Sequence, residues 1–418
     1  MKKIFTLVRI VCLTLLTCFL LAGCGKHMLV YRVNKSSELQ EYESELAEES
    51  LAEESIAEAS REAEEAKAAE RKKAEEDVFA KKEISREKTK VKGIYLTDST
   101  AGSDRMEDII SHIDETELNA VVIDVKNDEG KLALTLDSEK LQTMGASAGT
   151  IKDLPELLRE LHSHGIYAIA RIVCFRDPHM AELRPDLMEQ KADGSLFYDQ
   201  SGMTWVNPYK QEYWDYLDAA AYGCAQVGFD EVQLDYVRFC TEKGMQSVVH
   251  EGADCGKTEI ITRFVQYMSD KAAEYGIFMS TDVFGTIIDS YEDAEAVGQN
   301  YGEMSAAADY MCPMIYPSHY GDGSFGIAHP DLEPYQTIKS AMESSEKALK
   351  KAAKEDESQA AVRPWLQGFT AGYLENYLEY GAEELQEEIQ AVYDSGGEEW
   401  LIWNAANRYD WTAFQKAE

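Results

Sequence analysis

Between residues 91 and 418 the chain alternates eight times between a short β-rich run and a longer amphipathic segment. Several amphipathic segments end in glycine just before the next run, and glycine is a frequent helix terminator. This alternation predicts a (β/α)8 TIM barrel over residues 91–418. A doubly wound open sheet is the alternative, but it usually has fewer strands, and its glycine-rich phosphate motif does not occur in this sequence. The eight runs are 91–97, 119–126, 166–173, 230–237, 277–284, 309–316, 363–370 and 399–405.

Residues 1–23 have the pattern of a secretory signal peptide. "MKK" supplies positive charge, and the following apolar run ends in the lipobox-like "LAGC". The apolar run is shorter than the ~20 residues that a membrane-spanning helix needs. We therefore predict a lipoprotein signal peptide over 1–23 and lipidation of Cys24. The protein would then be held by lipid at the extracellular face of the membrane. An uncleaved N-terminal anchor is the alternative.

Residues 24–90 are predicted to form the lipidated N-terminus and a spacer. Glu, Ala, Lys and Ser dominate the second part of this region, which contains the tandem run "LAEESLAEESIAEAS" at 46–60. A period of five residues matches neither 3.5 nor 3.6, so its apolar side chains spread around a helix instead of forming one seam. A solvated, acidic helical spacer is therefore expected. A helix that binds a partner protein is the alternative.

Charge and cysteine content limit the partners. The formal net charge is −36, and a chain so acidic is repelled by nucleic acid and other anionic polymers. Five cysteines follow Cys24, an odd number at irregular spacing, which does not indicate a disulfide framework. A bond between Cys240 and Cys255 across one loop remains open. The others are Cys174, Cys224 and Cys312.

Polar residues recur at the ends of the predicted strands. In "VQLDYVRF" (232–239), Asp235 interrupts an apolar run. Burying an unpaired carboxylate costs several kcal/mol, so packing alone rarely explains such a residue. The active site of a TIM barrel lies at the carboxyl ends of its strands, where these residues would meet. The remaining candidates are Asp124, Lys126, Arg171, Arg238, Asp282, Tyr316, His319, Gln367 and Asn404.

Asp235 and Asp282 are predicted to be the catalytic pair. Period-two alternation points Asp235 into the barrel mouth, and Asp282 occupies the corresponding end of the next strand. Adjacent strands lie ~4.8 Å apart, which is compatible with the ~5–10 Å between the two carboxyl groups of a glycosidase. Asp235 would be the nucleophile or base, Asp282 the general acid, and the other candidates would position the sugar. The alternative is a structural ion-pair network with Arg171, Lys126 and Arg238.

Two further patterns bear on the ligand. Aromatic loops, "LFYDQSGMTWVNPYKQEYW" and "IYPSHYGDGSFG", would offer flat faces for sugar rings above the mouth. The sequence contains no G-x-S-x-G, H-E-x-x-H or paired C-x-x-C motif. His162 and His164 are interpreted as residues of a helix C-terminus, and His179 and His319 are the only candidates for a deacetylase-type metal site. We predict no metal and no cofactor.

Seven stretches carry a resemblance to a known family. They are "GIYLT", "TELNAVVIDVK", "IARIVCFRDP", "WVNPY", "GFDEVQLDYVRF", "MIYPSHY" and "RPWLQGFT", in order through nearly all of residues 91–418. Together they resemble a bacterial family of glycoside hydrolase domains, often lipoproteins, with no assigned substrate. The resemblance implies a TIM barrel distantly similar to α-amylase-like glycosidases, whose nucleophile at the end of strand 4 matches Asp235. Where that pattern has an arginine and a strand-5 glutamate, this chain has Gln233 and Asp282.

The sequence therefore predicts a lipid-anchored glycoside hydrolase. Its substrate would be an envelope or environmental polysaccharide or oligosaccharide, cleaved by a two-carboxylate mechanism. A non-catalytic carbohydrate-binding or envelope-organising lipoprotein is the alternative. The sugar, its linkage, the stereochemical outcome and the oligomeric state stay open.

Overall fold

The computed structural model describes residues 88–134, 146–147, 149–353 and 359–415. The chain divides into two units, 1–77 and 78–418, and every described element belongs to the second unit. The predicted signal peptide, Cys24 and the spacer up to residue 87 lie outside the described residues. Within the described ranges, no helix has the length and apolar character needed to cross a membrane.

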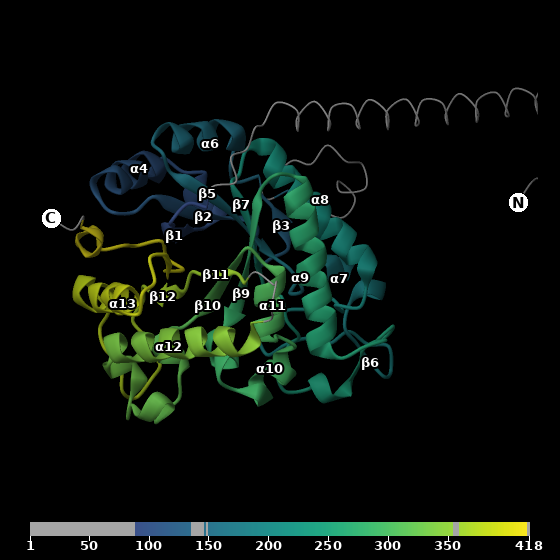
Figure 1. The fold of residues 1–418 in the computed structure, drawn as a ribbon. Helices are drawn as coiled ribbons and strands as arrows, with labels where there is room; N and C mark the ends of the chain where they lie inside the picture. The colour runs from purple at the N-terminus through teal and green to yellow at the C-terminus, as the bar shows by residue number, and fades with distance from the viewer. Residues whose placement is uncertain (1–87, 135–145, 148, 354–358, 416–418) are drawn as a thin grey trace, which may run out of the picture. The chain divides into compact units, whose positions relative to one another are not determined.

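Eight parallel strands close into a barrel (Figure 1). Closure occurs at β1, which pairs with β2 on one side and with β13 on the other. The predicted (β/α)8 barrel is confirmed, and each of the eight predicted runs contains its strand. The barrel strands are β1 (Lys92–Leu96), β2 (Ala120–Lys126), β5 (Tyr167–Val173), β7 (Glu231–Asp235), β9 (Phe278–Phe284), β10 (Tyr310–Met314), β12 (Trp365–Gln367) and β13 (Trp400–Trp403).

Helices surround the barrel, as Figure 1 shows for α4, α6, α8, α9, α12 and α13. The longer ones are α4 (Arg105–Glu115), α6 (Leu154–Ser163), α8 (Gln211–Val227), α9 (Lys257–Glu274), α12 (Pro334–Ala352) and α13 (Ala382–Asp394). Shorter ones are α3 (Asp98–Ala101), α7 (Met180–Leu183), α10 (Tyr291–Val297) and α11 (Tyr301–Ala307). Five two-residue strands within the described residues extend the sheet or join loops: β3 (Lys131–Leu132), β4 (Ala146–Ser147), β6 (Gln190–Lys191), β8 (Val248–Val249) and β11 (Ala361–Val362). Single 3-10 turns are Pro185–Leu187, Met245–Ser247, Gly285–Ile288, Pro317–His319, Ser324–Gly326, Pro330–Leu332 and Trp411–Phe414.

Helix ends follow local sequence signals. The Asp153 side chain caps α6 by accepting from the Glu156 amide at 3.0 Å, and His164 is the residue that ends this helix, as predicted. His162 Nε2 lies 2.9 Å from Asp230 Oδ2. Gly228, with φ of 115°, ends α8 in the left-handed conformation that glycine adopts without a steric penalty.

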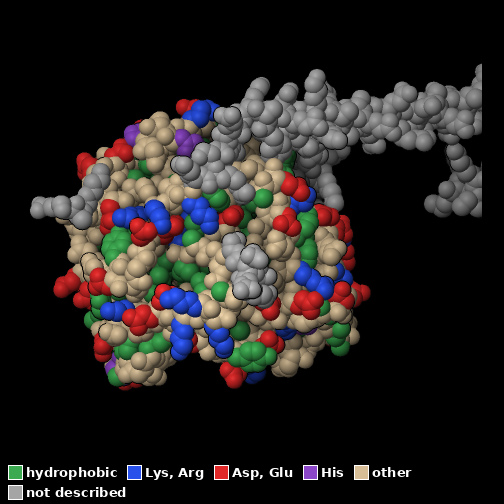
Figure 2. Space-filling model, in the orientation of Figure 1, with side chains coloured by type: hydrophobic (Ala, Val, Ile, Leu, Met, Phe, Trp, Pro, Cys, Tyr) green, Lys and Arg blue, Asp and Glu red, His purple; other side chains and the backbone are tan. Residues whose placement is uncertain are grey.

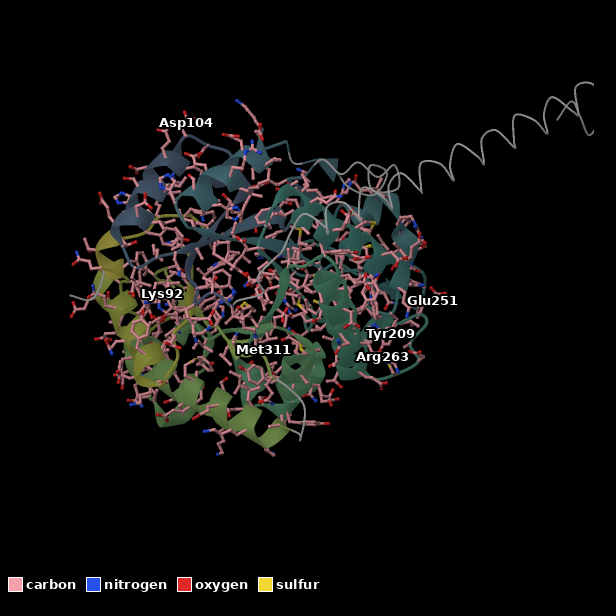
Figure 3. All side chains as sticks on the ribbon, turned by 45° about the horizontal axis from the view of Figure 1, so that its top comes forward. Lys92, Asp104, Tyr209, Glu251, Arg263 and Met311 are labelled. Atoms are coloured by element: carbon pink, nitrogen blue, oxygen red, sulfur yellow. The ribbon has the colours of Figure 1, made fainter. Side chains whose placement is uncertain are left out.

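Alternating side chains give the barrel two layers. Val232 and Leu234 of β7 belong to the large apolar core between the strands and the helices. The side chains that alternate with them point inward: Gln233 reaches Cys312 Sγ on β10 at 3.4 Å, and Glu231 binds Arg363. Figure 3 shows how densely side chains fill the molecule, with Asp104, Glu251 and Arg263 at its rim. Period two therefore divides the β7 side chains between the helix-facing layer and the barrel interior.

Buried charges close the amino end of the barrel. Arg363 Nη1 donates to both Glu231 oxygens at 2.9 and 3.0 Å, and its Nε donates to Glu399 Oε2 at 2.9 Å. The guanidinium also lies 3.8 Å from the centre of the Tyr310 ring. Arg363 and Glu231 are fully buried. This cluster lies at the end of the barrel opposite the carboxyl ends of the strands, where we interpret it as stabilising the fold.

The five cysteines of the barrel are free thiols, so Cys240 and Cys255 do not form a disulfide.

The surface carries charges of both signs. On the face shown in Figure 2, Asp and Glu are interspersed with Lys and Arg.

Candidate active site

A pocket of about 210 Å³ opens at the carboxyl ends of the strands. It contains six of the predicted site residues, contributed by β5, β7, β9 and the segments that follow β7 and β10. The prediction that polar strand ends converge on one site therefore agrees with the geometry. The lining residues are Asp128, Arg171, Asp235, Tyr236, Arg238, Asp282, Phe284, Met314, Tyr316, His319, Trp365 and Trp403.

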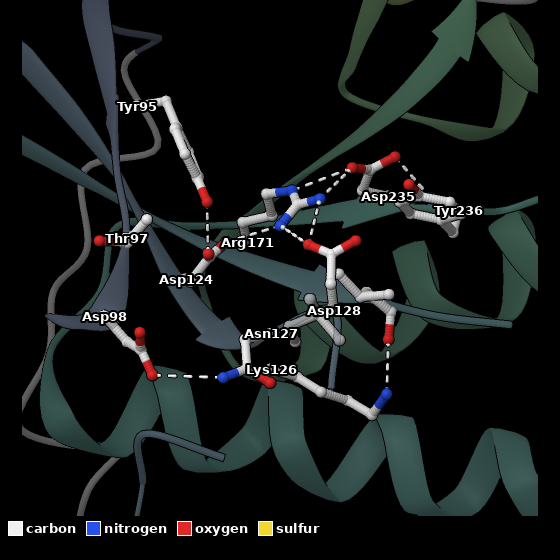
Figure 4. A network of polar contacts seen from close by, with 12 residues as sticks. Tyr95, Thr97, Asp98, Asp124, Lys126, Asn127, Asp128, Arg171, Asp235 and Tyr236 are labelled. Atoms are coloured by element: carbon white, nitrogen blue, oxygen red, sulfur yellow. Dashed lines mark hydrogen bonds and ion pairs between the residues drawn. The ribbon is translucent and has the colours of Figure 1, made fainter. Parts of the chain in front are cut away.

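Arg171 of β5 links the carboxylates at the floor of the pocket (Figure 4). Its Nη1 donates to Asp124 Oδ1 at 2.6 Å, and its Nε and Nη2 donate to Asp235 Oδ2 at 2.9 and 2.6 Å. Asp124 Oδ2 accepts a further bond from Tyr95 OH at 2.5 Å. Because the planar guanidinium is only 1 % exposed, these charge-assisted bonds fix the Asp235 carboxylate in orientation.

Asp235 has contacts that suit an ionised carboxylate. Besides the two bonds from Arg171, its Oδ1 accepts from the Tyr236 amide at 2.6 Å. Tyr236 has φ of 52°, a left-handed conformation that costs a non-glycine residue roughly 1–2 kcal/mol. This turn ends β7 one residue after Asp235 and brings Tyr236 into the pocket lining, although simple alternation would place it on the helix side.

Asp282 of β9 lies beside Asp235. Leu234 pairs with Thr281, so the next residue of each strand comes into register at the mouth. Trp365 Nε1 donates to Asp282 Oδ1 at 2.7 Å, and the residue is 2 % exposed. Burial, followed by the nearby charge of Asp235, raises the pKa of Asp282 well above its usual range.

The two aspartates thus differ in environment. Asp235 forms an ion pair with Arg171, whereas no Lys, Arg or His within the described ranges forms an ion pair with Asp282. A carboxyl group bound to arginine beside a buried carboxyl group with a raised pKa is an arrangement that suits nucleophile and acid roles. The predicted ion-pair alternative holds in part, because Asp235 does pair with Arg171.

Aromatic rings form the walls of the pocket. Trp403 stacks on Tyr95, with ring centres 4.0 Å apart and planes inclined at 24°. The Arg238 guanidinium lies 4.6 Å from the Phe284 ring centre and 5.2 Å from that of Tyr236. In the described part of the chain it has no carboxylate within 4.0 Å, so its remaining donors are available to a ligand. Flat apolar faces and free donors together fit a sugar ring.

Four predicted site residues do not line this pocket. Asp124 lies behind Arg171. Gln367 is buried, where it donates to Asp331 Oδ1 at 2.9 Å and accepts from the Ser318 amide at 3.1 Å. Asn404 Nδ2 donates to the Arg408 carbonyl at 2.8 Å and thereby shapes the turn after β13.

Lys126 has been rotated away from the mouth by a β-bulge. The pairing of β2 with β5 shifts register between Asp124 and Lys126, which places Lys126 opposite Ile172, a residue of the helix-facing core. Its ammonium is completely buried and pairs with Asp177 Oδ2 at 2.9 Å. In this position Lys126 does not reach the pocket, so the structure disagrees with its predicted role in positioning the sugar.

Several pocket residues were not predicted as site residues. Trp365 could have been found, because it stands two residues before Gln367 on the same strand and so shares its inward direction. No local signal distinguishes Trp403, Phe284 or Met314 from packing residues. Within the described ranges, no three His, Cys, Asp or Glu side chains are grouped so that they could hold a metal ion.

Comparisons with known proteins show the family of this chain. Residues 93–409 match the model of a family described as "Putative glycosyl hydrolase domain". A solved hypothetical protein from Ruminiclostridium thermocellum ATCC 27405 is 32% identical, over 46% of this chain and 97% of that chain, with a TM-score of 0.42. No curated protein matches.

Two similar solved structures are glycosidases by name. The PgaB (BpsB) glycoside hydrolase domain from Bordetella bronchiseptica is 10% identical, over 79% of this chain and 100% of that chain, with a TM-score of 0.55. The alpha-galactosidase TtGalA from Thermus thermophilus, solved with stachyose, is 10% identical over 79% and 63%, with a TM-score of 0.49. At this identity the likeness to the PgaB domain shows a shared fold.

Proposed function

Since the chain belongs to the family described as "Putative glycosyl hydrolase domain", we propose that it is a glycosidase that cleaves a polysaccharide or oligosaccharide with Asp235 and Asp282. The observation that carries this proposal is the pair of neighbouring aspartates in one pocket, one bound to an arginine and the other buried against Trp365 with a raised pKa. No metal or cofactor is needed for a reaction of this type.

Asp235 would act as the nucleophile. Direct attack by Asp235 would make the enzyme a retaining glycosidase, a class in which the two carboxyl groups lie ~5–5.5 Å apart. In the first step an Asp235 oxygen bonds to the anomeric carbon, the glycosidic C–O bond breaks, and Asp282 gives its proton to the leaving oxygen. In the second step water replaces Asp235, and Asp282 takes back a proton. Arg171 would position Asp235 in both steps.

The proposal is tested with purified protein on a panel of polysaccharides and aryl glycosides, measuring released reducing ends or aryl group. We expect Asp235→Asn to lower turnover of the substrate found by about 10³-fold or more, because the amide cannot form the glycosyl-enzyme bond. Its melting temperature should fall slightly, because Arg171 loses one ionic partner but keeps Asp124. Unchanged activity per folded molecule would contradict the nucleophile role. Carbohydrate binding without any turnover would favour the non-catalytic alternative.

We also propose that Cys24 carries a lipid that holds the enzyme at the outer face of the membrane, where polysaccharide is accessible. The support is "LAGC" after an apolar run. Each buried CH₂ of an acyl chain contributes about 0.8 kcal/mol, so two or more chains anchor a protein firmly. Cys24→Ser should release the protein from membranes or block its processing, as judged by fractionation and mass spectrometry. A processed variant that still sediments with membranes would contradict the anchor.

A further inference from the structure

A second pocket of about 360 Å³ adjoins the candidate active site, and His319 lines both. Building on the glycosidase proposal, we propose that this second pocket binds another sugar residue of the same chain, and that this residue belongs to a neutral or amino sugar. The pocket lies between the segment after β10 and the segment after β12, at the same end of the barrel as the aspartates. Its lining residues are Ser318, His319, Tyr320, Gly321, Asp322, His329, Pro330, Asp331, Leu374, Glu375 and Asn376.

The lining offers hydrogen-bonding groups in a fixed arrangement. His329 Nδ1 lies 3.1 Å from Asp322 Oδ1 and 3.4 Å from Asn376 Nδ2. Nδ1 either donates to Asp322 or accepts from Asn376, and Nε2 of the neutral ring is correspondingly an acceptor or a donor for a ligand. These groups come from both segments, so the site is built across the gap between them. Donors and acceptors at this spacing suit the hydroxyl groups of a sugar ring.

One lining residue also has spare hydrogen-bonding capacity. Ser318 Oγ is a buried atom without a hydrogen-bond partner in the described part of the chain. Ser318 is 8 % exposed, and a buried hydroxyl left unpaired typically costs about 1–3 kcal/mol. A bound ligand could satisfy such groups after a small side-chain movement.

Exposed apolar side chains concentrate around this pocket. Phe325, Leu332, Tyr373 and Tyr377 are 36%, 38%, 68% and 39% exposed, and all four belong to the two segments that form it. The Tyr377 ring lies close to Gly372. Aromatic rings that remain exposed beside a polar pocket are typical of a surface on which sugar rings stack.

Charge selects the kind of sugar. The second pocket has carboxyl groups at Asp322, Asp331 and Glu375, whereas none of its lining residues is Lys or Arg. Asp331 is already bound by Gln367 Nε2 at 2.9 Å and by the Leu378 amide at 3.2 Å. A uronic acid would meet uncompensated negative charge here, but hydroxyl and ammonium groups would not. The overall charge of −36 acts in the same direction.

The test uses the full chain carrying Asp235→Asn, so that glycans stay intact, on an array of neutral, amino-sugar and uronic acid oligosaccharides of one to six residues. We expect binding of neutral or amino-sugar chains of two or more residues. Adding Tyr373→Ala or Asn376→Ala should weaken that binding by about tenfold without affecting single sugars. Tyr291→Ala is the matched control, because Tyr291 is similarly exposed at 73% but lies on α10, whereas Tyr373 directly precedes the lining residue Leu374.

Three results would overturn this inference: no oligosaccharide binding, binding that neither pocket variant changes, or a preference for uronic acids. Hydrolysis of the same glycans by the unmodified chain separates this result from the glycosidase proposal. Binding that depends on Tyr373 and Asn376 without hydrolysis would support the second pocket and contradict catalysis. Hydrolysis by the unmodified chain, with binding unchanged in both pocket variants, would support catalysis and contradict the second pocket.

Discussion

Asp282→Asn is expected to lower glycosidase turnover by about 10³-fold or more while leaving the melting temperature at or above that of the unmodified protein. The asparagine cannot protonate the leaving oxygen. Its carbonyl oxygen can still accept the bond from Trp365 Nε1, and the substitution removes a buried ionisable group next to Asp235. Substrates with good leaving groups, such as nitrophenyl glycosides, should be affected least, because their departure needs little protonation.

The pH profile gives an independent check of the acid role. Because burial and the charge of Asp235 raise the pKa of Asp282, kcat/KM should fall as the pH rises through that raised pKa and the acid loses its proton. In Asp282→Asn the residual activity should lose this alkaline limb. If the unmodified protein and Asp282→Asn showed the same alkaline limb, a group other than Asp282 would cause it.

Glu388→Gln is the matched control for this substitution. Glu388 of α13 is also a fully buried carboxyl group, and burial raises its pKa to about 8. Its oxygens bind the Gln367 amide at 2.8 Å and Tyr380 OH at 2.7 Å, outside the candidate pocket. Turnover should therefore survive this change. If both variants lost activity equally, disturbance of a buried carboxyl group would explain the loss as well as acid catalysis does.

The fold could be predicted because its signal repeats. Each strand combines an apolar face toward the helices with an inward set, and Val232 and Leu234 alternate with Gln233 and Asp235 as the sequence indicates. Eight repetitions of the same pattern leave few alternatives to a closed barrel. The same alternation brought Asp235 and Asp282 into one pocket.

The errors lie where the backbone departs from regular geometry. A bulge after Asp124 turned Lys126 toward α8, and the left-handed turn at Tyr236 brought that ring into the site. The sequence predicts neither the bulge nor the left-handed turn, since Lys126 and Tyr236 both continue an ordinary strand pattern. Gln367 and Asn404 were misplaced for another reason: strand-end amides serve loop backbones as readily as ligands, and only tertiary contacts distinguish the two uses.

Arg363→Met should destabilise the fold by roughly 3–5 kcal/mol without changing activity per folded molecule, because it leaves two carboxylates buried without their cation at the end of the barrel remote from the pocket. The loss should depend on pH. Burial raises the pKa of Glu231, and removing Arg363 takes away the interaction that opposes this shift. A carboxyl group with a raised pKa holds its proton longer in the folded state, so the stability of the variant should decrease further as the pH rises from 5 to 8.

Chemical denaturation at both pH values and turnover corrected for the folded fraction measure these effects. Arg363→Lys is the control. It keeps the positive charge but lacks the forked guanidinium that reaches Glu231 and Glu399 together. Its free energy of unfolding should therefore lie between those of the unmodified protein and Arg363→Met. A loss of turnover per folded molecule as large as that of Asp282→Asn would mean that the two ends of the barrel are not independent. In that case the division between a structural amino end and a catalytic carboxyl end would have to be abandoned, because the buried charges of β7 would then act as one network from Glu231 to Asp235.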